Sequence, residues 1–134
     1  MLYPMFAYVA FIFLFICYNF YLRFQSVRGR KVSMGYYRLY DPKNAEIPIA
    51  IIAGAKHLAN MFETPVLFYV VSILAIVLQQ ETTVMIGLAW CYVVSRGVHA
   101  FVHTTYNNVF HRLIIFWVSI FLLMSMWVSL AMSV

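Results

Sequence analysis

Three polar side chains interrupt an otherwise apolar stretch of the chain. Lys56, Asn60 and Glu63 are spaced i, i+4 and i+7, so on an α-helix they fall within an arc of roughly 60° on one face. An ionised Lys or Glu that faced lipid would be energetically costly. We therefore expect this face to look toward protein or a water-filled cavity, with partners supplied by another part of the chain.

A second polar block lies further along the chain. Arg96, His99 and His103 are spaced i, i+3 and i+7, which again places them on one helix face. Arg112 follows after a short turn, where the last apolar stretch begins. If the two blocks meet at one end of the fold, they form a polar site suited to a water-soluble, anionic ligand.

The composition places both blocks in a membrane protein. Of the 134 residues, 65% are hydrophobic and only 10% are charged, whereas soluble domains average about 25% charged residues. The net charge is +5, and six of the nine Lys and Arg residues lie in or beside one loop: Arg23, Arg28, Arg30, Lys31, Arg38 and Lys43. Beside apolar spans, such a cluster favours an anionic lipid surface over nucleic acid as its partner.

Four apolar segments are long enough to cross a bilayer, since about 20 residues span its hydrocarbon core. They cover residues 3–24, 47–78, 83–103 and 110–133. Residues 25–45 form the polar, basic connection between the first two. The sequence thus predicts an all-α fold, a single-domain integral membrane four-helix bundle with antiparallel neighbours.

The charge pattern also predicts an orientation. The segment 3–24 has no positively charged leader and no small-residue cleavage motif, so we interpret it as a retained helix and not a signal peptide. The basic loop 25–45 should then lie in the cytoplasm and the N-terminus outside. Counting back from Leu78 puts the first polar block at the cytoplasmic mouth of the second span. Pro65 should bend that span, because it cannot donate a hydrogen bond to the Met61 carbonyl.

With these elements in place, the sequence resembles the MAPEG superfamily, the membrane-associated proteins of eicosanoid and glutathione metabolism. The resemblance rests on Lys56-x-x-x-Asn60-x-x-Glu63-x-Pro65, on Arg96-x-x-His99-x-x-x-His103 and on the following Arg112. It covers all four spans and is nearer to the bacterial members. It implies a homotrimer that binds glutathione between neighbouring subunits near the cytoplasmic side, in a bacterial inner membrane.

The resemblance also implies roles for individual residues. Lys56, Asn60 and Glu63 match family positions that hold the tripeptide, and Arg96 and His103 match positions that complete its site. Arg112 matches the arginine that activates the glutathione thiol. Lys56 replaces a typical Arg and has no bidentate fork, and His103 replaces a typical Tyr. His99 lies on the same helix face, and we include it among the binding residues.

The chemistry implied is nucleophilic. A guanidinium stabilises a thiolate, and Arg112 could do so with His111 or His103 as a general acid–base. A lipophilic second substrate would enter sideways from the bilayer. Conjugation to an electrophile and reduction of a peroxide are both compatible with these residues.

Other interpretations stay open at this point. Glu63 could pair with Arg96 or Lys56 only to hold the helices together, and Arg112 could be an interfacial anchor. The chain could also be a non-catalytic accessory subunit of a larger membrane complex. Direct contact of Glu63 with Arg96 and the lack of a cavity would favour such a packing role.

The sequence gives less support to a metal site and to a place for His57 in the binding site. Histidines one turn apart, such as His99 and His103, can ligate a metal, but no carboxylate lies near them in sequence. Cys17 and Cys91 have no ligand spacing. We therefore expect neither a metal site nor a disulfide. His57 points roughly 90° away from the face of Lys56, so we expect it at the membrane interface and not in the site.

Overall fold

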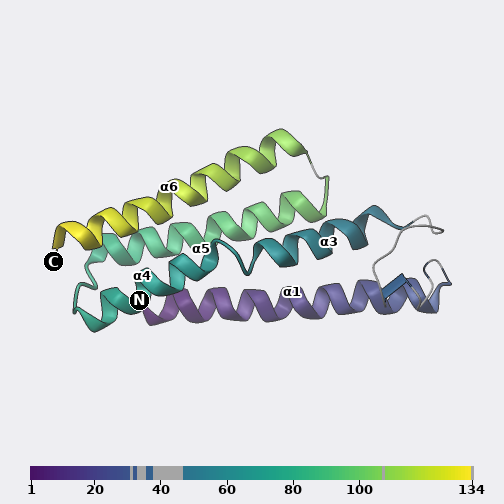
Figure 1. Cartoon of the computed structure of the whole chain (residues 1–134), viewed down its shortest axis with the longest axis horizontal. Coiled ribbons are helices and arrows are strands. Elements are labelled where there is room, and N and C mark those ends of the chain that lie inside the picture. Colours follow the sequence, from purple (N-terminus) through teal and green to yellow (C-terminus); the bar gives the residue numbers. More distant parts are fainter. Residues whose placement is uncertain (31, 33–35, 38–46, 107, 134) are drawn as a thin grey trace.

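A computed structural model describes residues 1–30, 32, 36–37, 47–106 and 108–133 of the chain. With the helix labels of Figure 1, the elements are α1 (Leu2–Arg28), α3 (Ile49–Asn60), α4 (Pro65–Val77), α5 (Thr83–Thr104) and α6 (Val109–Ser133). The predicted all-helical fold is confirmed. Of the basic-loop residues, Lys31, Arg38 and Lys43 lie outside the described residues.

Four segments of the described chain are long and apolar enough to cross a membrane: Leu2–Arg28, Ala50–Val77, Thr83–Thr104 and Val109–Ser133. Helix is the expected state there, because in lipid every backbone N–H and C=O must find its partner within the segment. These four segments lie where the sequence predicts spans over residues 3–24, 47–78, 83–103 and 110–133.

Side-chain caps start two of these helices. Thr82 precedes α5, and its Oγ1 accepts a hydrogen bond of 3.1 Å from the Met85 backbone N–H. Asn108 precedes α6, and its Oδ1 accepts from the N–H groups of Phe110 and His111 at 2.9 and 3.2 Å. These contacts satisfy donors that a helix start leaves without an intrahelical partner.

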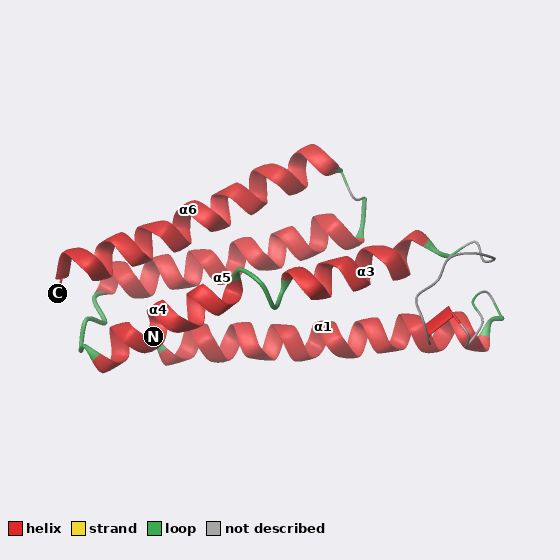
Figure 2. Cartoon of the chain, in the orientation of Figure 1, coloured by secondary structure: helices red, strands yellow, loops and turns green. Residues whose placement is uncertain are grey.

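The second span is not one continuous helix, which differs from the prediction of a single helix over residues 47–78. A turn at residues 61–64 separates α3 from α4, and Figure 2 shows it as a loop between two helical pieces. Pro65 is the first residue of α4 and cannot donate to the Met61 carbonyl. The turn is closed instead by bonds such as Phe62 N to Ala59 O at 3.0 Å.

The helix α5 lies at the centre of the packing. It contacts α1, α3 and α6, while α4 packs against α6 and α1. An aromatic cluster fills the space between these helices: Phe68 stacks on Tyr92 at 4.6 Å between ring centroids, and Tyr8 meets Phe68 edge-on at 5.9 Å. The core thus ties the first three spans together.

The outer surfaces of α1 and α6 are apolar and face away from the bundle. Phe13 and Phe20 on α1 and Phe121 on α6 are more than half exposed, as expected for helices that contact lipid. Figure 1 shows the N-terminus and the end of α6 at one end, and the end of α1 and the start of α3 at the other. The first polar block reaches the α3–α4 turn beside the middle of α1, where His57 contacts Phe15.

Candidate functional site

A buried arginine joins the two polar blocks. Arg96, in the cytoplasmic half predicted for α5, is only 1% exposed. Its Nη2 donates to both the backbone O and the side-chain Oδ1 of Asn60, each at 3.4 Å. Because α3 ends at Asn60, this contact fixes the end of that helix against α5.

Three buried histidines lie next to this contact. His57 of α3 is 0% exposed, and its ring lies 5.2 Å from the ring centroids of both His99 and His103 of α5. His99 and His103 are themselves 6.0 Å apart. The two polar blocks therefore do meet inside the fold, but through His57 as well as through Asn60.

The expectation that His57 sits at the membrane interface is wrong. The face of α3 that carries Lys56 is the exposed one, so the neighbouring face turns inward. Gly54, His57 and Met61, spaced i, i+3 and i+7, form the buried stripe. A signal for this orientation was the small residue Gly54, which lets α3 approach α1 closely: a Cβ there would overlap Asn19 Oδ1.

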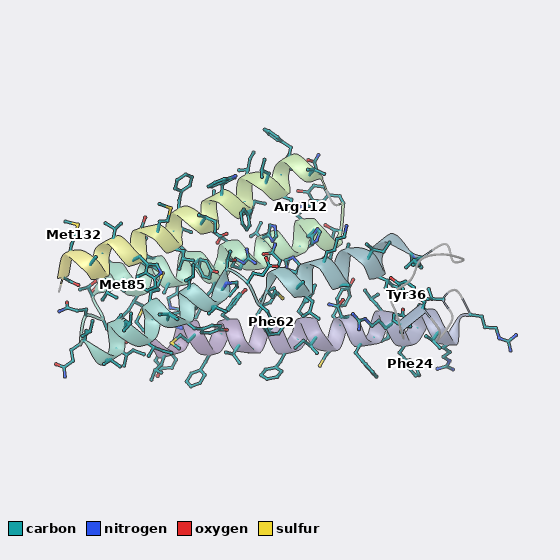
Figure 3. All side chains as sticks on the ribbon, in the orientation of Figure 1. Phe24, Tyr36, Phe62, Met85, Arg112 and Met132 are labelled. Atoms are coloured by element: carbon teal, nitrogen blue, oxygen red, sulfur yellow. The ribbon has the colours of Figure 1, made fainter. Side chains whose placement is uncertain are left out.

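Arg112 reaches the site from α6. Its Nη1 lies 3.0 Å from His103 Nδ1, so the last span is linked to the histidine cluster. Figure 3 shows Arg112 near the α5–α6 turn, at the opposite end of α6 from Met132. The other candidate acid–base histidine, His111, is exposed and bonds to the hydroxyl of Tyr106 at 3.1 Å.

A pocket opens between α3, α5 and α6 at this point. Its volume is about 250 Å³, and its polar lining comes from Asn60, His99 and Arg112. Val109, Leu113 and Phe116 form an apolar wall on α6. Three of the predicted site residues thus line one hollow. That hollow is smaller than the ~300–1,000 Å³ of typical ligand pockets.

Lys56 and Glu63 do not join this pocket within one chain. Both side chains are exposed, whereas Arg96 is buried. Glu63 lies in the turn after α3 and so has left the helix face on which Lys56 sits. Among the described residues no ion pair joins Glu63 to Arg96 or to Lys56, so the packing pair considered from the sequence is not formed.

Several buried polar atoms in this region have no hydrogen-bond partner in the described part of the chain. They include Nε and Nη1 of Arg96, both ring nitrogens of His57, and Nδ1 of His99. A buried donor or acceptor left unsatisfied costs about 1–3 kcal/mol, and more if charged. Such groups point to water or a polar ligand at this end of the bundle.

Further hollows among the described residues are mainly apolar and lie elsewhere. A larger one of about 650 Å³ runs between α5 and α6, with Leu88, Phe121 and Met124 in its wall and no charged residue. It suits a lipid chain and not a charged peptide. Among the described residues, no group of three His, Cys, Asp or Glu side chains is arranged to hold a metal ion.

The fold and the site define a multi-pass membrane protein with a polar, arginine-containing pocket between α3, α5 and α6. The family model of MAPEG matches residues 3–132, and the chain belongs to the MAPEG family. It is therefore an integral membrane protein of the superfamily of glutathione and eicosanoid metabolism. Comparison with curated proteins and with solved structures gave no match.

Proposed function

We propose that this protein binds glutathione in the pocket of Asn60, His99 and Arg112, and transfers it to a lipophilic electrophile or uses it to reduce a lipophilic peroxide. The observation that carries the proposal is the pocket itself, because a guanidinium, an imidazole and an amide converge there beside a buried arginine. Membership of the MAPEG family supports glutathione as the ligand.

The electrostatics of the pocket match this ligand. Glutathione carries two carboxylates, and its thiol reacts as the thiolate. Arg112 lines the pocket, and Arg96 donates a hydrogen bond to Asn60, which also lines it. Among the described residues no acidic side chain pairs with Arg96, so within this part of the chain no ion pair neutralises its positive charge. A fixed positive potential in a low-dielectric surrounding stabilises a bound anion more than it would in water.

The residues have separate tasks in the reaction. Arg112 holds the thiolate sulfur, and His99, whose ring lines the pocket, accepts the thiol proton. In conjugation the sulfur attacks a carbon of the electrophile, and the leaving group departs with its electron pair. In peroxide reduction the sulfur attacks the distal oxygen, the O–O bond breaks, and the alkoxide takes a proton.

The apolar wall of the pocket provides the way in for the second substrate. Val109 and Leu113 are 66% and 52% exposed on α6, on a span that faces lipid. A lipophilic molecule can therefore slide from the bilayer along α6 and meet the thiolate without passing through water. This arrangement favours substrates that partition into membranes.

The small volume of the pocket supports assembly into a homotrimer. One chain encloses only about 250 Å³. The side chains of Lys56 and Glu63 are exposed, and neither forms an ion pair with another described residue. A neighbouring subunit packed on that face would enlarge the site and bring these charges to the ligand. We place the pocket on the cytoplasmic side of a bacterial inner membrane, with the N-terminus outside, following the charge of the loop.

Calorimetric titration of the purified protein with glutathione tests the proposal. Micromolar to millimolar binding is expected for the unmodified protein, with loss of most of the heat for Arg112→Ala. Glu63→Gln should weaken binding only in samples that are trimeric by light scattering. Arg28→Ala is the matched control, because it removes an exposed positive charge at the far end of α1.

Absence of binding to the unmodified protein, or equal binding by Arg112→Ala, would rule out this function. The chain would then fit better as an accessory subunit, whose pocket contributes only to packing.

A further inference from the structure

A line of buried contacts runs through all four spans and ends at Arg112. Phe15 of α1 meets the ring of His57 edge-on at 4.9 Å. His57 of α3 lies 5.2 Å from His103 of α5. The Nδ1 atom of His103 lies 3.0 Å from Nη1 of Arg112 on α6. The guanidinium is thus supported by the whole bundle and not by α6 alone.

The contact between Arg112 and His103 determines the proton position on the imidazole. An arginine nitrogen can only donate a hydrogen bond, so Nδ1 of His103 must accept it. The ring is then the neutral tautomer with its proton on Nε2. In this state the Nδ1 lone pair is already used, so His103 cannot take the thiol proton at that atom.

Two other rings fix the plane of this imidazole. His99 lies roughly parallel to His103, with 26° between the planes, and His57 is tilted by 59° against it. His103 is 6% exposed and His57 is 0% exposed, so neither ring has room to turn freely. A ring held on two sides presents its Nδ1 atom in one fixed direction.

We propose that His103 is a positioning residue for Arg112: its Nδ1 atom holds the guanidinium toward the pocket, and the rings of His57 and His99 hold His103. The proposal rests on the proposed role of Arg112 in stabilising the thiolate. It assigns His103 neither to glutathione contact nor to proton transfer, and it gives the buried His57 a function that the sequence pattern did not suggest.

Three variants separate positioning from simple packing. His103→Gln keeps an acceptor oxygen that can bond to Arg112, whereas His103→Phe keeps the ring and loses the acceptor. Phe101→Leu is the control, since this side chain lies on the same helix as His103 but is exposed and outside the pocket. Turnover of a chloronitrobenzene electrophile is measured against glutathione concentration, and each variant is first checked for folding by circular dichroism.

The expected result is a fall in kcat of roughly 10- to 100-fold for His103→Phe, the cost typical of a small misplacement of a catalytic group. The KM for glutathione should change little, because His103 does not touch it. His103→Gln should recover most of the rate, and Phe101→Leu should retain the rate of the unmodified protein. A rate equal to that of the unmodified protein for His103→Phe, or a loss as large for His103→Gln, would overturn the proposal.

A second measurement does not depend on catalysis or on the folding of a variant. Nitrogen-15 chemical shifts of selectively labelled histidine distinguish the two neutral tautomers in the unmodified protein. We expect His103 to carry its proton on Nε2 with or without glutathione. Protonation at Nδ1 would overturn the inference, whereas failure of glutathione to bind, with the Nε2 tautomer present, would overturn only the proposed function.

Discussion

Replacement of Gly54 by Ala should destabilise the protein, because α3 and α1 approach closely at this position. A Cβ at this position would overlap Oδ1 of Asn19 and would lie 3.3 Å from its Cγ. Asn19 is 4% exposed, and its Nδ2 donates to the Phe15 carbonyl at 3.0 Å. The asparagine can move away only by giving up that bond or by pushing α1 away from α3.

The expected cost follows from these two routes. Losing a buried hydrogen bond costs about 0.5–1.5 kcal/mol, and overpacking a filled interior costs about 1–3 kcal/mol. Because either route is sufficient, the two costs are alternatives, and we expect Gly54→Ala to lower the free energy of unfolding by about 1–3 kcal/mol. The Phe15 carbonyl bonds to Asn19, and the Phe15 ring packs against His57 beside the pocket. A shift of Asn19 should therefore disturb the site, and the activity should fall as well.

The assay is thermal unfolding in detergent, followed by circular dichroism, with Gly97→Ala as the matched control. No atom lies within 4 Å of a Cβ built on Gly97, and Ala is a better helix former than Gly. Gly97→Ala should therefore leave the Tm unchanged or raise it. The double substitution Asn19→Ala and Gly54→Ala removes the side chain that the new Cβ would overlap, so it should restore part of the lost Tm. Equal Tm values for the two single variants would refute the close-packing argument.

Three further predictions concern the helix cap and the pocket. Thr82→Ala removes the bond to the Met85 N–H and should cost about 1 kcal/mol in chemical unfolding, while Thr83→Ala should cost less. Arg112→Lys keeps the charge but loses the planar fork, so steady-state kinetics should show a lower kcat with glutathione binding largely retained; full activity would contradict a directed role of the guanidinium. Leu113→Trp places a larger side chain in the apolar wall of the pocket. The KM for a bulky lipophilic substrate should rise, and the KM for glutathione should stay unchanged. A change only in the KM for glutathione would contradict lateral entry.

Much of the fold follows from local physical rules that a sequence shows directly. The length of the apolar stretches predicts four spans, because only helices of about 20 residues satisfy the backbone across a bilayer. Pro65 predicts a disturbance in the second span. Whether the helix bends or ends at this proline was not predictable, because that depends on how the neighbouring residues pack.

The site was predictable only in part. The spacing of Arg96, His99 and His103 correctly indicated a common face, because one uninterrupted helix carries all three. Glu63 fell outside the pocket because the turn before Pro65 ends the helix on which the spacing argument depended. The burial of His57 was not predicted. Residue spacing shows which side chains share a helix face, but packing against neighbouring helices determines which face turns inward.

The central claim is that Arg112 stabilises a glutathione thiolate in the pocket, and the ultraviolet absorbance of the thiolate tests it most directly. Glutathione is added at neutral pH to the unmodified protein and to Arg112→Ala, each at saturating concentration. For the unmodified protein we predict a thiolate absorbance that corresponds to about one bound thiolate per chain or per assembled pocket. In Arg112→Ala this absorbance should be lost even where glutathione still binds. No thiolate with the unmodified protein, or the same thiolate signal in Arg112→Ala, would contradict the account.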